Sequence, residues 1–165
     1  MIKRELYMNR IRPFIGGELI KVMTGIRRSG KSVMLELIKE ELAEAGVAPS
    51  QMISINFEDM RYSHLQTATA LHDEIIKRAE GIEGKAYLFF DEIQEVEGWE
   101  KCVNSLRVAL DCDIYITGSN AKLLSGELAT YIGGRYVEFV IYPFSFAEFL
   151  ELYHTICLLY TSDAA

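Results

Sequence analysis

Short apolar runs alternate with amphipathic stretches along most of the chain. The apolar runs have the length of buried strands, and five are expected: Leu19–Thr24, Met52–Asn56, Tyr87–Phe90, Ile114–Thr117 and Tyr136–Tyr142. Strands that alternate with helices in this way indicate a parallel sheet with helices on both faces. The predicted fold class is therefore α/β, with three layers in the order α/β/α.

The amphipathic stretches between these runs predict the helices. In the stretch 32–45, Met34, Ile38 and Leu42 recur every four residues, and Gly46 follows where a C-terminal cap belongs. Further helices are expected over 3–14, 68–79 and 99–110, and a broken one over 121–131.

A last helix is predicted to begin at Ser145. Pro143 stops the fifth apolar run, because proline cannot donate a hydrogen bond to a sheet. Ser145 and Glu148 then have the spacing of a capping box, in which each side chain accepts the backbone N–H of the other residue.

The length and composition fit one α/β domain. The chain has 165 residues, of which 50% are hydrophobic and 25% charged. We expect an N-terminal helical segment over 1–18 and a single domain over 19–152. Residues 153–165 are expected to be a truncated or artefactual tail, because Cys157–Ala165 can be back-translated into a common transposon-end sequencing adapter.

The net charge of −7 argues against a nucleic-acid-binding surface over the whole domain, although a local patch is compatible with it. Basic residues do cluster near the N-terminus, at Lys3, Arg4, Arg10 and Arg12. We interpret this cluster as the solvated face of a helix.

The cysteines and the hydropathy bear on the compartment. Cys102, Cys112 and Cys157 show no CxxC spacing, which favours a reduced cytosolic setting without a zinc site or disulfides. No signal peptide opens the chain, and no apolar run has the length of a membrane span. A cytoplasmic protein without membrane contact is expected.

Residues 25–32 read GIRRSGKS, a complete GxxxxGK[ST] loop between a predicted strand and a predicted helix. In such a loop the backbone N–H groups surround phosphates, Lys31 reaches the β- and γ-phosphates, and the Ser32 hydroxyl holds Mg²⁺. The alternative is a glycine-rich turn before an ordinary helix. Nucleotide contacts are expected from Gly25, Ile26, Arg27, Arg28, Ser29, Gly30, Lys31, Ser32 and Val33.

Two acidic residues follow the apolar run 87–90 directly. In open α/β sheets ligands bind at the carboxyl ends of the strands. Asp91 is suited to hold Mg²⁺, directly or through water, and Glu92 is suited to act as a general base toward the attacking water. The alternative is a strand that merely ends in polar residues.

Three further polar residues are candidates for the same chemistry. Ser119 and Asn120 follow the fourth strand, and either side chain can contact the γ-phosphate or orient the water; Asn120 is slightly favoured. Arg135 precedes the fifth strand. It is either an arginine finger for a neighbouring subunit or a partner in a structural ion pair.

Several blocks in this order resemble the AAA+-type predicted ATPases of bacteria and archaea, in which a P-loop domain precedes a C-terminal domain of unknown function. The blocks are GIRRSGKS, INFED, YLFFDEIQ with a following Trp99, ITGSNAKLLS, GGRY and YPFSFAEFL. The similarity extends to about Leu152 and implies a P-loop NTPase fold with a five-stranded sheet ordered 5-1-4-3-2.

The resemblance also implies roles for matching residues. Nucleotide binding is implied for Gly25, Gly30, Lys31 and Ser32, and the Mg²⁺ and catalytic acids are implied to be Asp91 and Glu92. Ser119 or Asn120 matches the sensor position of the family. Arg135 matches its Gly-Arg position. We expect neither the C-terminal domain nor a helical lid with a second sensor arginine within these 165 residues. ATP hydrolysis is therefore expected of the intact protein, and whether these 165 residues hydrolyse ATP by themselves is left open.

The function expected is ATP binding and Mg²⁺-dependent ATP hydrolysis that drives or gates the missing C-terminal domain. One alternative is an ATP-gated switch or DNA-associated module that hydrolyses little, and another is a small-molecule kinase. ATP and Mg²⁺ are the cofactors expected, and a homo-oligomer and DNA are further candidate partners.

Overall fold

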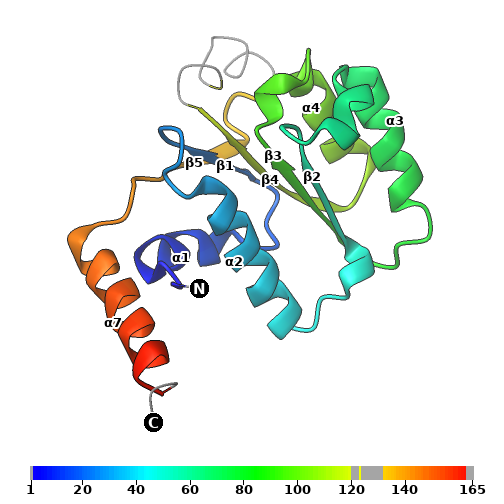
Figure 1. Cartoon of the computed structure of the whole chain (residues 1–165). Coiled ribbons are helices and arrows are strands. Elements are labelled where there is room, and N and C mark those ends of the chain that lie inside the picture. The colour runs from blue at the N-terminus through cyan, green and yellow to red at the C-terminus, as the bar shows by residue number, and fades with distance from the viewer. Residues whose placement is uncertain (1, 120–122, 124–131, 163–165) are drawn as a thin grey trace.

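A parallel sheet forms the centre of the protein, whose structure, a computed structural model, describes residues 2–119, 123 and 132–162. Its strands are β1 (Ile20–Thr24), β2 (Met52–Asn56), β3 (Ala86–Asp91), β4 (Cys112–Gly118) and β5 (Tyr136–Val140). They lie in the order β2-β3-β4-β1-β5, with every neighbouring pair parallel (Figure 1). The predicted fold class and the strand order 5-1-4-3-2 are confirmed.

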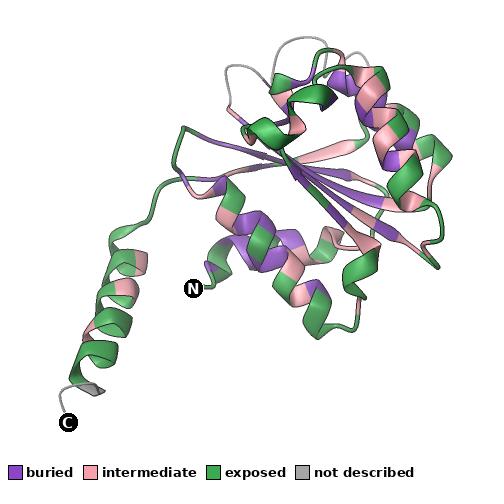
Figure 2. Ribbon diagram, turned by 45° about the vertical axis from the view of Figure 1, so that its right-hand side comes forward, coloured by how far each residue is buried: buried purple, intermediate pink, exposed green. Residues whose placement is uncertain are grey.

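Helices cover both faces of the sheet (Figures 1 and 2). The helices with described bounds are α1 (Glu5–Ile11), α2 (Lys31–Glu44), α3 (Ala68–Ala79), α4 (Trp99–Ala109) and α7 (Phe146–Ser162). Short 3-10 helices cover Arg12–Phe14, Pro49–Gln51, Met60–Leu65 and Ile93–Glu95. The α1 and α2 helices pack on one face, and α3 and α4 pack on the other.

Both faces of β3 are buried, so the domain has two cores. Phe89 and Phe90 are consecutive and therefore point to opposite faces. Phe90 packs in one cluster with Leu106 of α4, and Phe89 packs in another with Met8 of α1 and Ile38 of α2. None of these side chains is more than 2% exposed. The N-terminal segment thus packs into the same body as the sheet.

One predicted helix is divided in the structure, and another lies largely outside the described residues. The stretch 3–14 divides into α1 and a 3-10 turn, because Pro13 has no N–H with which to continue the helix. The broken helix predicted over 121–131 lies largely outside the described residues, which include only Leu123 of that stretch.

Four strands have bounds other than those predicted: the first begins at Ile20 rather than Leu19, and the third covers Ala86–Asp91 rather than Tyr87–Phe90. The fourth begins at Cys112 rather than Ile114, because Asp113 is buried within the strand despite its charge. The fifth ends at Val140 rather than Tyr142. The bounds of β2 and α3 agree with the prediction.

The last helix lies apart from the layers. After β5 the chain leaves the body, and most of α7 is exposed (Figure 2). Ser145 Oγ accepts the Glu148 N–H at 3.2 Å, and Glu148 Oε2 accepts the Ser145 N–H at 2.8 Å. The capping box is therefore formed. Within the described part of the chain, no helix is long and apolar enough to cross a membrane.

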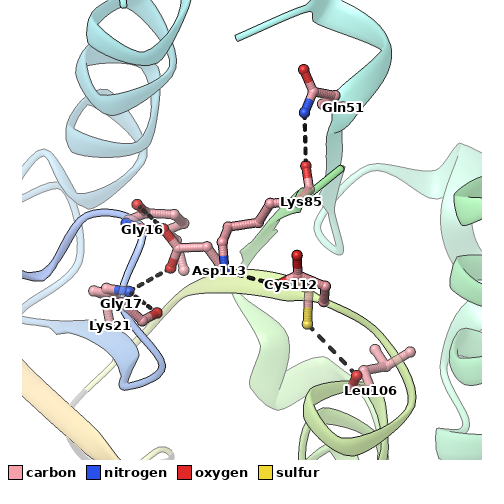
Figure 3. A network of polar contacts seen from close by, with 10 residues as sticks. Gly16, Gly17, Lys21, Gln51, Lys85, Leu106, Cys112 and Asp113 are labelled. Carbon is pink, nitrogen blue, oxygen red and sulfur yellow. Dashed lines mark hydrogen bonds and ion pairs between the residues drawn. The ribbon is translucent and has the colours of Figure 1, made fainter. Parts of the chain in front are cut away.

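A buried ion pair joins β1 to β4 near their amino ends. Lys21 Nζ donates to Asp113 Oδ1, and both side chains are fully buried. The same ammonium donates to Gly17 O at 3.0 Å, and Asp113 Oδ2 accepts the Gly16 N–H at 2.7 Å (Figure 3). The Tyr115 hydroxyl also donates to Asp113 Oδ2, at 2.6 Å. One carboxylate thus ties both strands to the loop before β1.

Burial opposes the charge of this network. It lowers the pKa of Lys21 despite the attraction of Asp113, and it raises the pKa of Tyr115, an effect that Asp113 reinforces. A buried charge that loses its partner keeps its desolvation cost, so removing one partner is costlier than the net contribution of the pair.

We expect Asp113→Asn to lower the free energy of unfolding by about 3–5 kcal/mol, because it leaves the Lys21 ammonium buried without a counter-charge. Without Asp113 the folded-state pKa of Lys21 falls further below its unfolded value. The unfolded chain then binds more protons, and the variant gains stability as pH rises above neutrality. Urea unfolding between pH 7 and 10 measures both effects.

The matched control is Asp111→Asn, which removes the same charge two residues earlier. Asp111 Oδ1 accepts from Lys85 Nζ at 2.8 Å, but its side chain is 69% exposed. An exposed pair contributes about 0–1 kcal/mol. Equal losses in the two variants would contradict the structural role assigned to Lys21 and Asp113.

Candidate functional site

The loop between β1 and α2 follows a path that two glycines permit. Gly25 has φ 152° and Gly30 has φ 95°. A Cβ atom on Gly25 would lie 2.2 Å from the Ile141 carbonyl oxygen, which is backbone and cannot move aside. Only glycine therefore fits at residue 25, and the loop is packed against the chain that leaves β5.

Lys31 begins α2 and lies between the loop and the acidic residues of the neighbouring strand. Its side chain is 4% exposed. The ammonium donates to Gly25 O at 3.3 Å and to Ile26 O at 3.1 Å, and it lies 3.7 Å from Glu92 Oε1. The structure thus brings the loop lysine and the acids of β3 to the same edge of the sheet.

A threonine hydroxyl fixes the acidic half of the site. Thr117 of β4 donates its hydroxyl hydrogen to Asp91 Oδ1 at 2.5 Å and accepts the Glu92 N–H at 3.0 Å. Glu92 has φ 55°, which costs a residue other than glycine free energy. The Thr117 contact and the amide of Gln94, which donates to Glu92 Oε2, hold Glu92 in this conformation.

A cavity of about 390 Å³ lies between the loop and two acids, Glu58 and Glu92. Its lining residues are Arg27, Arg28, Gly30, Lys31, Ser32, Val33, Glu58 and Glu92. Arg27 and Arg28 are exposed, as side chains between the two loop glycines usually are, and Arg27 Nη2 lies 3.7 Å from Glu58 Oε1.

The donors around this cavity fit a metal-bound phosphate. The Lys31 ammonium and the N–H groups at the start of α2 suit an anion. The Ser32 hydroxyl and the Asp91 carboxylate are oxygen ligands of the kind that Mg²⁺ takes. Asp91 is 7% exposed, so its carboxylate is largely shielded from bulk water.

Ser119, Asn120 and Arg135 are the other predicted site residues, and only Ser119 and Arg135 are described. Ser119 follows β4 and is half-buried. Asn120 lies outside the described residues, so its sensor role stays a prediction. Arg135 is exposed, and its carbonyl accepts the Ile20 N–H at 2.9 Å, at the start of β1. Since β1 and β5 are parallel, Arg135 lies one strand length, roughly 17 Å, from the loop edge.

Three residues of the site region were missed or misread from the sequence. Glu58 and Thr117 had no assigned role, although both belong to the carboxyl-end region of strands in the predicted sheet. The expectation that Arg4 lies on a solvated basic face is wrong. Arg4 is 2% exposed, and its Nη1 donates to the loop carbonyl of Ser29 at 2.8 Å.

Comparison with known proteins gives a family for this arrangement. A family model described as an AAA domain matches residues 17–150. An uncharacterized protein of Haemophilus influenzae is 48% identical over 151 residues, which cover 92% of this chain and 38% of that protein. An uncharacterized protein of Methanocaldococcus jannaschii is 41% identical over 133 residues, which cover 80% of this chain and 28% of that protein.

Solved structures share the fold at low sequence identity. The ORC1 protein of Aeropyrum pernix, solved in complex with DNA, matches with a TM-score of 0.63 and 18% identity over 94% of this chain and 49% of that one. AMPPCP-bound DnaA from Aquifex aeolicus matches with a TM-score of 0.53 and 17% identity over 85% of this chain and 46% of that one.

We expect Thr117→Val to lower the free energy of unfolding by about 1–3 kcal/mol, because it leaves the buried Asp91 carboxylate and the Glu92 N–H without their shared partner. Valine has nearly the shape of threonine, so the loss reports the hydroxyl. Thr117→Ser keeps the hydroxyl and is the control. Urea unfolding of both variants measures the difference, and wild-type stability of Thr117→Val would contradict the role of the hydroxyl.

Proposed function

The chain belongs to the AAA domain family, and from that premise we propose that it binds ATP and hydrolyses it to ADP and phosphate with Mg²⁺. The observation that carries this proposal is the approach of Lys31 Nζ to within 3.7 Å of Glu92 Oε1 across the cavity, beside the buried Asp91. The proposed phosphate-binding cation and the proposed base thus line one cavity, and the carboxylate proposed to hold the metal directly precedes that base in the chain.

Each group has a distinct part in the proposed reaction. The N–H groups of the loop and the Lys31 ammonium bind the phosphates and balance the charge that develops during transfer. Ser32 and Asp91 would hold Mg²⁺, which when bound would neutralise negative charge on the phosphates. These groups orient the triphosphate relative to Glu92.

Glu92 would act on the water. One carboxylate oxygen accepts a proton from the water as the water oxygen bonds to the γ-phosphorus and the bond to the bridging oxygen breaks. Gln94 already donates to Glu92 Oε2, which leaves Oε1 to face the cavity. Phosphate bound at Lys31 would draw the ammonium from Glu92 and release Oε1 for the water.

The structural neighbours support the nucleotide assignment. The DnaA structure from Aquifex aeolicus contains AMPPCP, and its fold matches this chain. The ORC1 structure from Aeropyrum pernix contains DNA, which makes DNA a partner to test for this chain. The net charge of −7 limits any such contact to a local patch.

The relatives support a role within a longer protein. The chain spans 38% and 28% of the two curated relatives, so most of each relative lies outside the matched segment. We infer that the nucleotide state of this domain acts on the remainder of such a protein.

Lys31→Ala should weaken ADP and ATP binding by about tenfold or more, since a charge-assisted contact to phosphate contributes about 1.5–3 kcal/mol. Isothermal titration calorimetry measures the affinity. Lys77→Ala is the charge-matched control, because Lys77 lies exposed on α3 at the opposite face of the sheet. Wild-type nucleotide affinity in Lys31→Ala would contradict the proposal that this loop binds the phosphates.

Glu92→Gln should retain ATP and lower phosphate release by about a hundredfold or more, because the amide cannot accept the proton from water. Phosphate release and bound nucleotide are measured on the same sample, with exposed Glu95→Gln as the control. Unchanged turnover would exclude Glu92 as the base. Tight ATP binding with no turnover by the wild type would favour the ATP-gated switch.

A further inference from the structure

Arg4 is a buried cation that contacts three separate segments of the chain. Its side chain is fully buried, although it lies near the N-terminus. Nη1 donates to Ser29 O in the phosphate loop at 2.8 Å, Nη2 donates to Tyr142 O at 2.6 Å, and Nε donates to Glu148 Oε1 at 2.9 Å. One rigid guanidinium therefore joins the loop to the chain that follows β5.

Aromatic rings complete the surroundings of Arg4. Its guanidinium carbon lies 4.6 Å from the centre of the Tyr7 ring and 5.1 Å from that of Phe144. A planar guanidinium can stack on rings while its edge donates hydrogen bonds, which a lysine ammonium cannot do. The geometry is thus specific for arginine.

The loop end of this contact lies at the start of α2. Ser29 immediately precedes Gly30, and a Cβ atom on Gly30 would lie 2.8 Å from Arg4 Nη1. The bond to Ser29 O holds that carbonyl toward Arg4, which fixes the peptide that joins Ser29 to Gly30. This peptide is where the loop turns into the helix whose first N–H groups would bind phosphate.

The other end of the contact is Glu148, in the first turn of α7. Burial raises the pKa of its carboxyl group, but hydrogen bonds from Arg4 and Ser145 outweigh this effect and hold the pKa below its usual value. The carboxylate therefore stays charged while it caps α7 and pairs with Arg4. If α7 moved away, Arg4 would keep its buried charge and lose its counter-charge.

We propose that Arg4 is a positioning residue that couples the phosphate loop to the start of α7, so that nucleotide binding and the seating of Glu148 stabilise each other. The coupling rests on the nucleotide binding proposed above. It is reciprocal by thermodynamic necessity: if a seated Glu148 favours nucleotide binding, bound nucleotide favours the seated Glu148 to the same extent. Whatever follows α7 in a longer protein would then sense the loop through this contact.

A double-mutant cycle on nucleotide affinity tests the coupling. Glu148→Gln preserves the capping box, which accepts either residue, but removes the charge that Arg4 requires. Among the described residues, the hydrogen bonds of the Glu148 side chain go to Arg4 and Ser145, so we expect its effect on ADP affinity to pass through Arg4. We expect Glu148→Gln to weaken ADP binding about fivefold or more, the range typical of coupled sites.

The cycle is completed by Arg4→Gln and the double variant. Arg4→Gln should weaken ADP binding at least as much, and adding Glu148→Gln to it should have no further effect, since the connection is already cut. Glu151→Gln, an exposed acid on the same helix, is the control and should bind ADP like the wild type. Circular dichroism and thermal unfolding establish that every variant compared is folded.

Hydrogen exchange tests the reverse direction. ADP should slow amide exchange in the segment 142–150 of the wild type, and it should leave that segment unchanged in Arg4→Gln at an ADP concentration that saturates the variant. A protein in which Arg4 had only a structural role would show the same ADP effect in both.

The outcomes separate this proposal from the proposed function. Wild-type ADP affinity in folded Glu148→Gln, or additive losses in the double variant, would overturn the coupling while nucleotide binding stands. A wild-type chain that binds no ADP in calorimetry would overturn both. The coupling requires that Glu148→Gln weaken ADP binding in the otherwise wild-type protein and have no effect on ADP binding in the Arg4→Gln variant.

Discussion

The parallel pairing of β1, β4 and β3 is the constraint on which the site depends. In the sheet Thr24 lies beside Gly118, and Phe90 lies beside Ile116. The residues that follow these positions therefore emerge at the same edge, although they are far apart in the sequence. The loop after β1, the hydroxyl of Thr117 and the acids that end β3 meet there without any long side chain having to reach across the sheet.

The polar groups at the two edges of the sheet differ in how accessible they are to a ligand. At the amino edge, Lys21 and Asp113 are fully buried and paired, with loop N–H and C=O groups completing their hydrogen bonds. Because both side chains are fully buried and bonded to the protein, a ligand cannot reach them. At the carboxyl edge, the Lys31 ammonium makes long hydrogen bonds, of 3.3 and 3.1 Å, to the carbonyls of Gly25 and Ile26. It also lies 3.7 Å from Glu92 Oε1, with a cavity beside it. Those groups remain able to exchange partners, which phosphate binding requires.

The features predicted correctly from the sequence are those whose interacting residues lie close together along the chain. The apolar runs gave the strands, and the capping box at Ser145 and Glu148 formed because both partners lie within one turn. The loop glycines and the acids after β3 were found because strand, loop and helix follow one another in the chain. The sensor role of Asn120 stays a prediction, because Asn120 lies outside the described residues. The predicted site residue Arg135 lies at the opposite edge of the sheet from the loop.

Thr117 and Arg4 escaped sequence reasoning because their partners are distant along the chain. Thr117 contacts an acid 26 positions away, and its role requires knowing that β4 lies next to β3. Arg4 contacts residues 25, 138 and 144 positions away. In the sequence it stands among other basic residues, and nothing local distinguishes a buried guanidinium from a solvated one.

These long-range contacts bear on how the loop could respond to the rest of a longer protein. Gly25 is packed against the Ile141 carbonyl, and Ser29 is bonded to Arg4, which is itself held by Tyr142 and Glu148. Both ends of the loop thus rest on the few residues that follow β5. A shift of that segment would disturb, at two points, the loop backbone that we propose binds phosphate, whereas a shift of α3 or α4 would have to act through the whole sheet. The connection after β5 is therefore the shortest mechanical route between the nucleotide and anything attached to α7.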